Sequence, residues 1–169
     1  SDFGHKLPTL PPILMRLDDP LDPLEKRIAN LEASSAPPRD RATAWLEFGR
    51  AWQRHHRSLE ESCRAFREAA AADPTYYDAL DAAATMCTAM GRVELGNAYA
   101  RAAAAAAGQP GERARSLKLI ARNARRFGAI DEAEATLVQA LEADPSDGDA
   151  FEELARVRYQ RGDIVAAAA

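Results

Sequence analysis

Strand patterns, long apolar runs and cysteine are all scarce in this chain of 169 residues. No segment alternates apolar and polar residues over any length, so we expect an all-α protein. No stretch approaches the roughly 18 consecutive apolar residues of a membrane span, so we expect no membrane insertion. No signal peptide is visible, although the start looks trimmed and could have lost one.

Cysteine occurs only twice, at Cys63 and Cys87. Two isolated cysteines on predicted helices make neither a disulfide framework nor a metal site. We therefore expect both to be small core residues of a protein in a reducing compartment, and we expect a cytoplasmic location.

Lysine is nearly absent, because Lys6, Lys26 and Lys118 are the only lysines among 22 basic residues. Together with abundant alanine, this arginine bias indicates a GC-rich bacterial genome. The net charge of −4 argues against nonspecific nucleic-acid binding. The basic residues also lack interleaved aromatic side chains, so we expect no nucleic-acid partner.

Catalytic and cofactor motifs are missing as well. Of the three histidines, His55 and His56 are adjacent in a predicted turn, with no third metal ligand at a suitable spacing. The closely spaced Gly91 and Gly96 do not indicate a phosphate-binding loop, because their places in the repeat are a turn and a helix-packing position. No arrangement of a nucleophile and a base is present either. We expect no catalytic residue, no cofactor and no metal in this segment.

What the chain does have is a repeat of 34 residues. Gly128 and Gly162 are 34 apart, and so are Ser62 and Gly96, while Asp73-Pro74 is echoed by Asp144-Pro145. A helix–turn–helix unit with this period is typical of one repeat family. Residues 43 to 169 resemble the tetratricopeptide repeat (TPR) family, in which a large residue, a small residue, a turn glycine, two alanines and a closing proline recur. A generic alanine-rich bundle would not produce this echo.

The resemblance implies an all-α, right-handed α-solenoid of about seven repeat helices, preceded by an N-terminal extended arm and a helix. The arm and short helix occupy residues 1–42, and the repeats occupy 43–76, 77–110, 114–147 and 148–169, the last one partial. The chain would then stop early in the second helix of repeat four, without a polar capping helix. We expect either a fragment of a longer protein or an end covered by a partner or a second copy.

Helix packing and turns support the same register. Apolar residues share one face at Leu117, Ile120, Ala121 and Ala124. Gly128 and Gly162 fall just past such runs, where a left-handed C-cap is expected. Small residues are expected where paired helices approach closely: Ala84, Gly96, Ala121, Ala133 and Ala155.

The first repeat is irregular. Its turn, His55-His56-Arg57-Ser58, is one residue too long and has no glycine. We expect Trp45, Trp52 and Phe66 to be largely buried within this repeat.

A binding groove is the main functional expectation. In the TPR family the first helix of each repeat lines a concave groove, and the equivalent positions here include Arg50, Arg54, Thr85, Arg115, Lys118, Arg122, Arg126 and Arg156. Helical spacing alone places Arg115, Lys118, Arg122 and Arg126 on one stripe, with only Glu112 as a nearby acid. The stripe is either a cradle for a carboxylate- or phosphate-bearing peptide or ordinary solvation of an arginine-rich helix. Chaperone-binding members of the family use lysine and asparagine at particular groove positions. The absence of asparagine there disfavours a chaperone-tail receptor.

Two functions follow from the resemblance. The chain is a protein–protein interaction scaffold that binds a peptide segment of a partner, possibly acidic, in a partly basic groove. Alternatively, it is the N-terminal recognition module of a larger enzyme such as a transferase.

The N-terminal arm is rich in proline and in apolar residues. Pro8, Pro11 and Pro12 favour an extended strand, and Asp22 is expected to cap the following helix, with Pro23 at its first position. Leu7, Leu10, Ile13, Leu14, Met15 and Leu17 make the arm too apolar for a free tail. We expect residues 7–21 to dock on a repeat surface of the same chain or of a second copy, inside or outside the groove.

Overall fold

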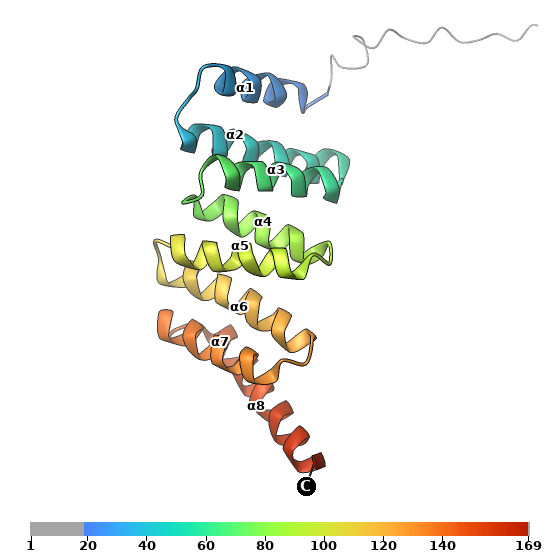
Figure 1. Ribbon diagram of the computed structural model, residues 1–169, viewed down its shortest axis with the longest axis vertical. Helices are drawn as coiled ribbons and strands as arrows, with labels where there is room; N and C mark the ends of the chain where they lie inside the picture. Colours follow the sequence, from blue (N-terminus) through green and yellow to red (C-terminus); the bar gives the residue numbers. More distant parts are fainter. Residues whose placement is uncertain (1–18, 169) are drawn as a thin grey trace, which may run out of the picture.

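The computed structural model describes residues 19–168, apart from the side chains of residues 164, 166 and 167. The prediction for the arm before residue 19 lies outside these residues. Eight α-helices stack one after another in a single row from α1 to α8 (Figure 1), and residues 19–168 contain no strand. Their bounds are α1 Asp22–Ala33, α2 Pro38–Ala51, α3 Leu59–Ala72, α4 Tyr77–Ala89, α5 Val93–Ala106, α6 Pro110–Arg126, α7 Ile130–Ala143 and α8 Gly148–Ala168, with a π-helix η1 at Trp52–His56. The expected all-α solenoid is confirmed, and no helix of the described part is long and apolar enough to cross a bilayer.

Close helix contacts depend on small side chains. A Cβ atom at Gly96 would overlap the Thr88 side chain and lie 3.1 Å from the carbonyl oxygen of Ala84, so α4 and α5 touch backbone to backbone. Ala121 and Ala133 are buried between α6 and α7 in a cluster with Leu137. Gly96, Ala121 and Ala133 were predicted to lie at close helix contacts, and the structure agrees, whereas Ala155, expected in the same role, is exposed on α8.

The turns between paired helices explain the glycines and the irregular first repeat. Gly91 and Gly128 have φ angles of +78° and +77°, and Arg57 takes the same left-handed conformation with φ of +52°. From Gly49 to Arg57 the chain is one residue longer than from Ala84 to Gly91. The π-helix η1 absorbs this extra residue, since a π-turn holds one more residue than an α-turn.

The repeated Asp-Pro pairs form one kind of turn. The Asp73 carboxylate accepts hydrogen bonds from the backbone N–H and hydroxyl of Thr75, at 3.0 and 2.7 Å. Asp144 does the same with Ser146, at 3.0 and 2.6 Å. In each case the aspartate ends a helix in an extended conformation, and the following proline cannot continue it.

Helix α8 departs from the expected repeat. Gly162 was predicted to end the first helix of repeat four in a left-handed turn. That prediction is wrong, because Gly162 lies inside α8 and its φ angle is not positive. No atom lies within 4 Å of a Cβ built at Gly162, so nothing packs there to force a turn.

The start of the described chain also differs from expectation. Asp22 is the first residue of α1 and makes no capping hydrogen bond, so the predicted cap is wrong. The residue before it, Leu21, accepts the first helical bond, and its own N–H donates to the Asp19 carboxylate at 3.0 Å. Leu21 is only 2% exposed and packs against Phe48, which anchors this end on the first repeat.

The aromatic residues of the first repeat are buried to different extents. Phe66 is buried as expected, whereas Trp45 and Trp52 are half-buried. The indole N–H of Trp45 donates to Glu32 at 3.3 Å, which keeps that edge at the surface.

Both cysteines are fully buried, as predicted, but they are not isolated from each other. The Sγ atoms of Cys63 on α3 and Cys87 on α4 lie 3.5 Å apart. Burial raises the pKa of Cys87 to about 12, so this thiol stays protonated at neutral pH.

Candidate functional site

The first helices of successive pairs, α2, α4, α6 and α8, share one surface, which we call the first-helix face. Side chains of α6 on this face form ion pairs with α4 on one side and α8 on the other. Two hollows open on it, with volumes of about 220 and 430 Å³. They adjoin, because both are lined by Asp81, Thr85 and Arg115.

The smaller hollow lies between α2 and α4. Arg50 lines it from α2, and Asp78 lines it from α4. Both side chains are exposed, and neither forms an ion pair with another residue of the described chain. The hollow therefore offers one free charge of each sign.

The larger hollow lies between α4, α6 and α8. Thr85, Leu119 and Asp149 line it, together with three cations of α6: Arg115, Lys118 and Arg122. All three cations belong to the predicted stripe, for which the sequence left open a peptide cradle or ordinary solvation and showed only Glu112 as a nearby acid. In the structure each of the three is paired with an acid of a neighbouring helix.

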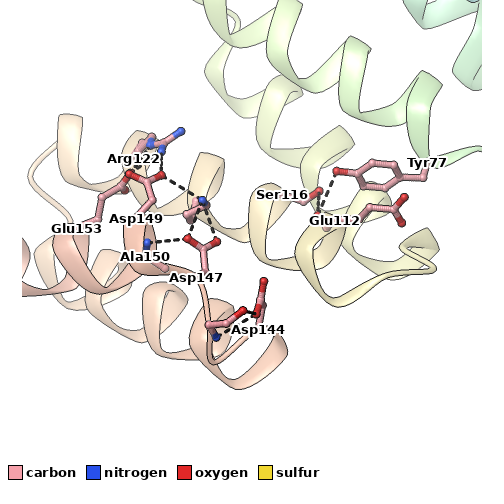
Figure 2. Close-up of polar contacts among 11 residues, drawn as sticks. Tyr77, Glu112, Ser116, Arg122, Asp144, Asp147, Asp149, Ala150 and Glu153 are labelled. Carbon is pink, nitrogen blue, oxygen red and sulfur yellow. Dashed lines mark hydrogen bonds and ion pairs between the residues drawn. The ribbon is translucent and has the colours of Figure 1, made fainter.

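The strongest pairing connects α6 to α8. Lys118 donates to Asp147 and Asp149 at 3.1 Å each, and Nε of Arg122 donates to Glu153 at 2.6 Å. Figure 2 shows Arg122 beside Glu153 and Asp149, with Asp147 close to the backbone N–H of Ala150. Glu153 is only 8% exposed, so its charge depends on Arg122 as a partner.

The pairs set the protonation states of this face. Burial lowers the pKa of Lys118, but its hydrogen bonds to Asp147 and Asp149 outweigh burial and hold the pKa above its ordinary value. Burial likewise raises the pKa of Asp147, and the bonds from Lys118 and Ala150 bring it below its ordinary value. Both groups are thus charged at neutral pH, and the α6–α8 junction is a stable ion-pair network.

Asp81 behaves differently. Its carboxylate pairs with Arg115 at 3.2 Å, yet burial dominates and raises its pKa. Nearby, the Tyr77 hydroxyl donates to the backbone carbonyl of Glu112 at 3.2 Å, which ties α4 to the start of α6 (Figure 2).

The acids of this network were missed as partners of the stripe. Asp81 and Arg115 do not occupy equivalent positions in their repeats, because the turn glycines Gly91 and Gly128 are 37 residues apart rather than 34, so the repeat pattern carried no signal for this pair. The remaining predicted residues, Arg54, Arg126 and Arg156, do not line either hollow. Arg156 pairs with Glu152 on its own helix at 3.5 Å.

The two turn histidines and the acids hold no metal cluster. Within residues 19–168 no three His, Cys, Asp or Glu side chains are arranged to hold a metal ion. His56 instead packs against Trp52 with the rings tilted by 51° and their centres 4.8 Å apart, and its Nε2 lies 3.5 Å from the Asp19 carboxylate.

Comparison with solved structures identifies the fold. The first TPR of Spaghetti (RPAP3), bound to an HSP90 peptide, superposes with a TM-score of 0.63 over 73% of this chain and 95% of that one, at 14% identity. The chain has the tetratricopeptide-repeat fold. PilF of Pseudomonas aeruginosa gives a TM-score of 0.64 over 86% of this TPR chain and 72% of its own, at 17% identity. MamA gives 0.56 over 81% and 85%, at 18% identity. Neither the family models nor the curated proteins compared with the sequence gave a match.

Proposed function

We propose that this TPR chain binds an extended peptide segment of a partner protein across the two hollows of the first-helix face. The observation that carries the proposal is that the hollows adjoin at Asp81, Thr85 and Arg115. They form one continuous polar track from α2 to α8. The similar structure that holds the HSP90 peptide SRMEEVD supports a peptide as the kind of ligand.

The charges of the track indicate the composition of the peptide. Arg115, Lys118 and Arg122 are already paired with acids, so they offer donors to a ligand without a large net positive field. Arg50 has no such partner among residues 19–168. A carboxylate of the peptide would therefore gain the most binding free energy at Arg50, because a guanidinium binds a carboxylate through two parallel hydrogen bonds. The partner is therefore a segment with one or two acidic residues rather than a long acidic run.

A peptide selection tests this proposal. Random peptides are selected on the immobilised chain, and the affinities of the enriched sequences are measured by fluorescence anisotropy. Thr85→Trp fills both hollows, since the exposed Thr85 side chain lines each of them and makes no hydrogen bond that would be lost. We expect this variant to lose binding. Ala135→Trp, at an exposed position of α7 outside both hollows, is the matched control and should bind like the parent.

Charge supplies the second arm of the test. Arg50→Glu should weaken the selected peptides that carry an acidic residue, and their affinity for the parent should fall with added salt. Equal binding by the parent and by Thr85→Trp would overturn the proposed site.

A further inference from the structure

Three arginines at the end of α2 have no acid to compensate their charge. Arg50, Arg54 and Arg57, which we call the arginine ridge, form no ion pair with another residue of the range 19–168. Residues 48–59 contain no Asp or Glu, so this segment is positive in a chain whose net charge is −4. The next two acids along the chain are already paired with other arginines.

The ridge continues the smaller hollow toward the turn that follows α2. Arg50 and Gln53 both line that hollow, and Arg54 and Arg57 follow them by four residues each. Side chains four apart on a helix are neighbours. The spacing holds through η1, since the rings at its first and last positions pack with their centres 4.8 Å apart. Arg54 and Arg57 therefore lie beyond the hollow on its own side of the helix, and both side chains are exposed.

The backbone of this turn adopts a conformation that costs free energy. Arg57 has a φ angle of +52°, whereas the two later turns place Gly91 and Gly128 at φ angles of +78° and +77°. Glycine adopts this left-handed region without steric cost, and an L side chain does not. The π-helix η1 is a second departure, and both π-turns and strained residues concentrate at functional sites. An arginine at a position that favours glycine indicates a role for its side chain.

Two neighbouring guanidiniums match a phosphate better than a single carboxylate. A carboxylate is satisfied by one guanidinium, and Arg50 in the hollow supplies one. A phosphorylated side chain carries a charge of about −1.5 to −2 at neutral pH and three acceptor oxygens, so it can engage both Arg54 and Arg57. Asp78 shares the hollow with Arg50, so the more highly charged anion is favoured farther along the ridge.

A protein segment fits the ridge better than a nucleic acid does. The ridge is short, and a nucleic acid would bring its further phosphates against a chain of net charge −4. The aromatic residue of η1, Trp52, is half-buried and packs against Phe48 and His56, so it does not stand free for base stacking.

We propose that Arg54 and Arg57 bind a phosphorylated residue of the partner's peptide, at the turn end of the polar track. The inference rests on the proposed function, because it extends the path of the peptide beyond the two hollows. It adds a condition to that function: phosphorylation of the partner is what makes its binding tight.

Two matched peptide libraries test the proposal. One carries a fixed phosphoserine flanked by random residues, and the other carries serine in its place. Both are selected on the immobilised chain, and the affinities of the enriched sequences are measured by fluorescence anisotropy. The enriched phosphopeptides should bind the parent about tenfold more tightly than their serine forms, because hydrogen bonds between charged groups are strong. Equal affinity of the two forms would overturn the proposal.

Variants of the ridge assign the preference to its residues. Arg54→Gln/Arg57→Gln should lose the preference for phosphoserine and bind both forms as the parent binds the serine form. Arg101→Gln/Arg126→Gln removes the same charge from two exposed arginines that also lack an ion pair among the described residues, and it should keep the preference. Arg57→Gly relieves the left-handed backbone, so it should weaken phosphopeptide binding without lowering the Tm. A ridge double variant that still prefers phosphoserine refutes the site.

Thr85→Trp separates this inference from the proposed function. If it abolishes binding of both peptide forms, the hollows and the ridge act on one peptide, as proposed. If phosphopeptides still bind it and lose affinity only on loss of Arg54 and Arg57, the hollows are refuted as the peptide site and the phosphate site stands. A short single-stranded oligonucleotide that binds the parent more tightly than the enriched phosphopeptides, and depends on the same two arginines, would overturn the proposal in favour of a nucleic acid.

Discussion

The same substitution at two glycines should have opposite effects on stability. Gly96 and Gly162 both lie inside helices, α5 and α8, so replacing either by alanine gains helix propensity worth about 0.8–1.0 kcal/mol. At Gly162 a Cβ meets no atom within 4 Å, so the whole gain is retained. Gly162→Ala should therefore stabilise the chain by about 1 kcal/mol.

At Gly96 the surroundings decide the sign. The new Cβ would lie 3.1 Å from the carbonyl oxygen of Ala84 and 3.1 Å from the backbone nitrogen of Thr88, and would overlap the Thr88 side chain. Backbone atoms of a packed helix cannot yield without moving α4 away from α5, and overpacking of this kind costs about 1–3 kcal/mol. After subtraction of the propensity gain, we expect Gly96→Ala to destabilise by about 1 kcal/mol.

Thermal unfolding followed by circular dichroism at 222 nm measures both variants against the parent. For a chain of this size, 1 kcal/mol shifts Tm by about 2–4 °C, so the two variants should differ by roughly twice that. A rise in Tm for Gly96→Ala would show that α4 and α5 are not in backbone contact. A fall for Gly162→Ala would show that the chain turns at Gly162 in a left-handed conformation, as the repeat pattern alone predicted.

Three further predictions concern single groups. Asp147→Asn should destabilise the chain at neutral pH and have little effect in acid. The folded-state pKa of Asp147 is depressed, so its contribution to the free energy of unfolding is complete above the unfolded pKa of about 3.9 and is lost as the pH falls through the folded pKa. Urea titrations of both proteins at several pH values measure this dependence. Leu21→Ala should cost about 2–5 kcal/mol because the side chain is only 2% exposed, and an unchanged urea midpoint would contradict its packing on the first repeat. Cys63 and Cys87 should react with a chromogenic aromatic disulfide only after unfolding, because both side chains are 0% exposed and the pKa of Cys87 is about 12. Rapid reaction of the native chain would contradict their burial.

The features that the sequence predicted well depend on local geometry repeated along the chain. Gly128 must turn left-handed because the helix before it ends there, and Ala121 and Ala133 must be small because two helices cross at those points. Each is a constraint inside one helix pair, and a period of 34 residues carries it from pair to pair. The all-α solenoid and the burial of both cysteines follow from the same constraints.

The features that were missed depend on what lies beside a residue in the next repeat. Helical spacing placed Arg115, Lys118 and Arg122 on one stripe, but spacing within α6 says nothing about the acids of α4 and α8 that neutralise it. In the same way, Cys63 and Cys87 belong to different repeats, and only packing of α3 on α4 shows that their sulfur atoms touch.

Gly162 shows how a repeat signature depends on its neighbour. At Gly128 the left-handed turn is held by α7, which folds back and packs on Ala121 and Ala124 of α6. At Gly162 no atom lies within 4 Å of a built Cβ, and the described chain continues as α8, whose helical hydrogen bonds satisfy the backbone N–H and C=O groups.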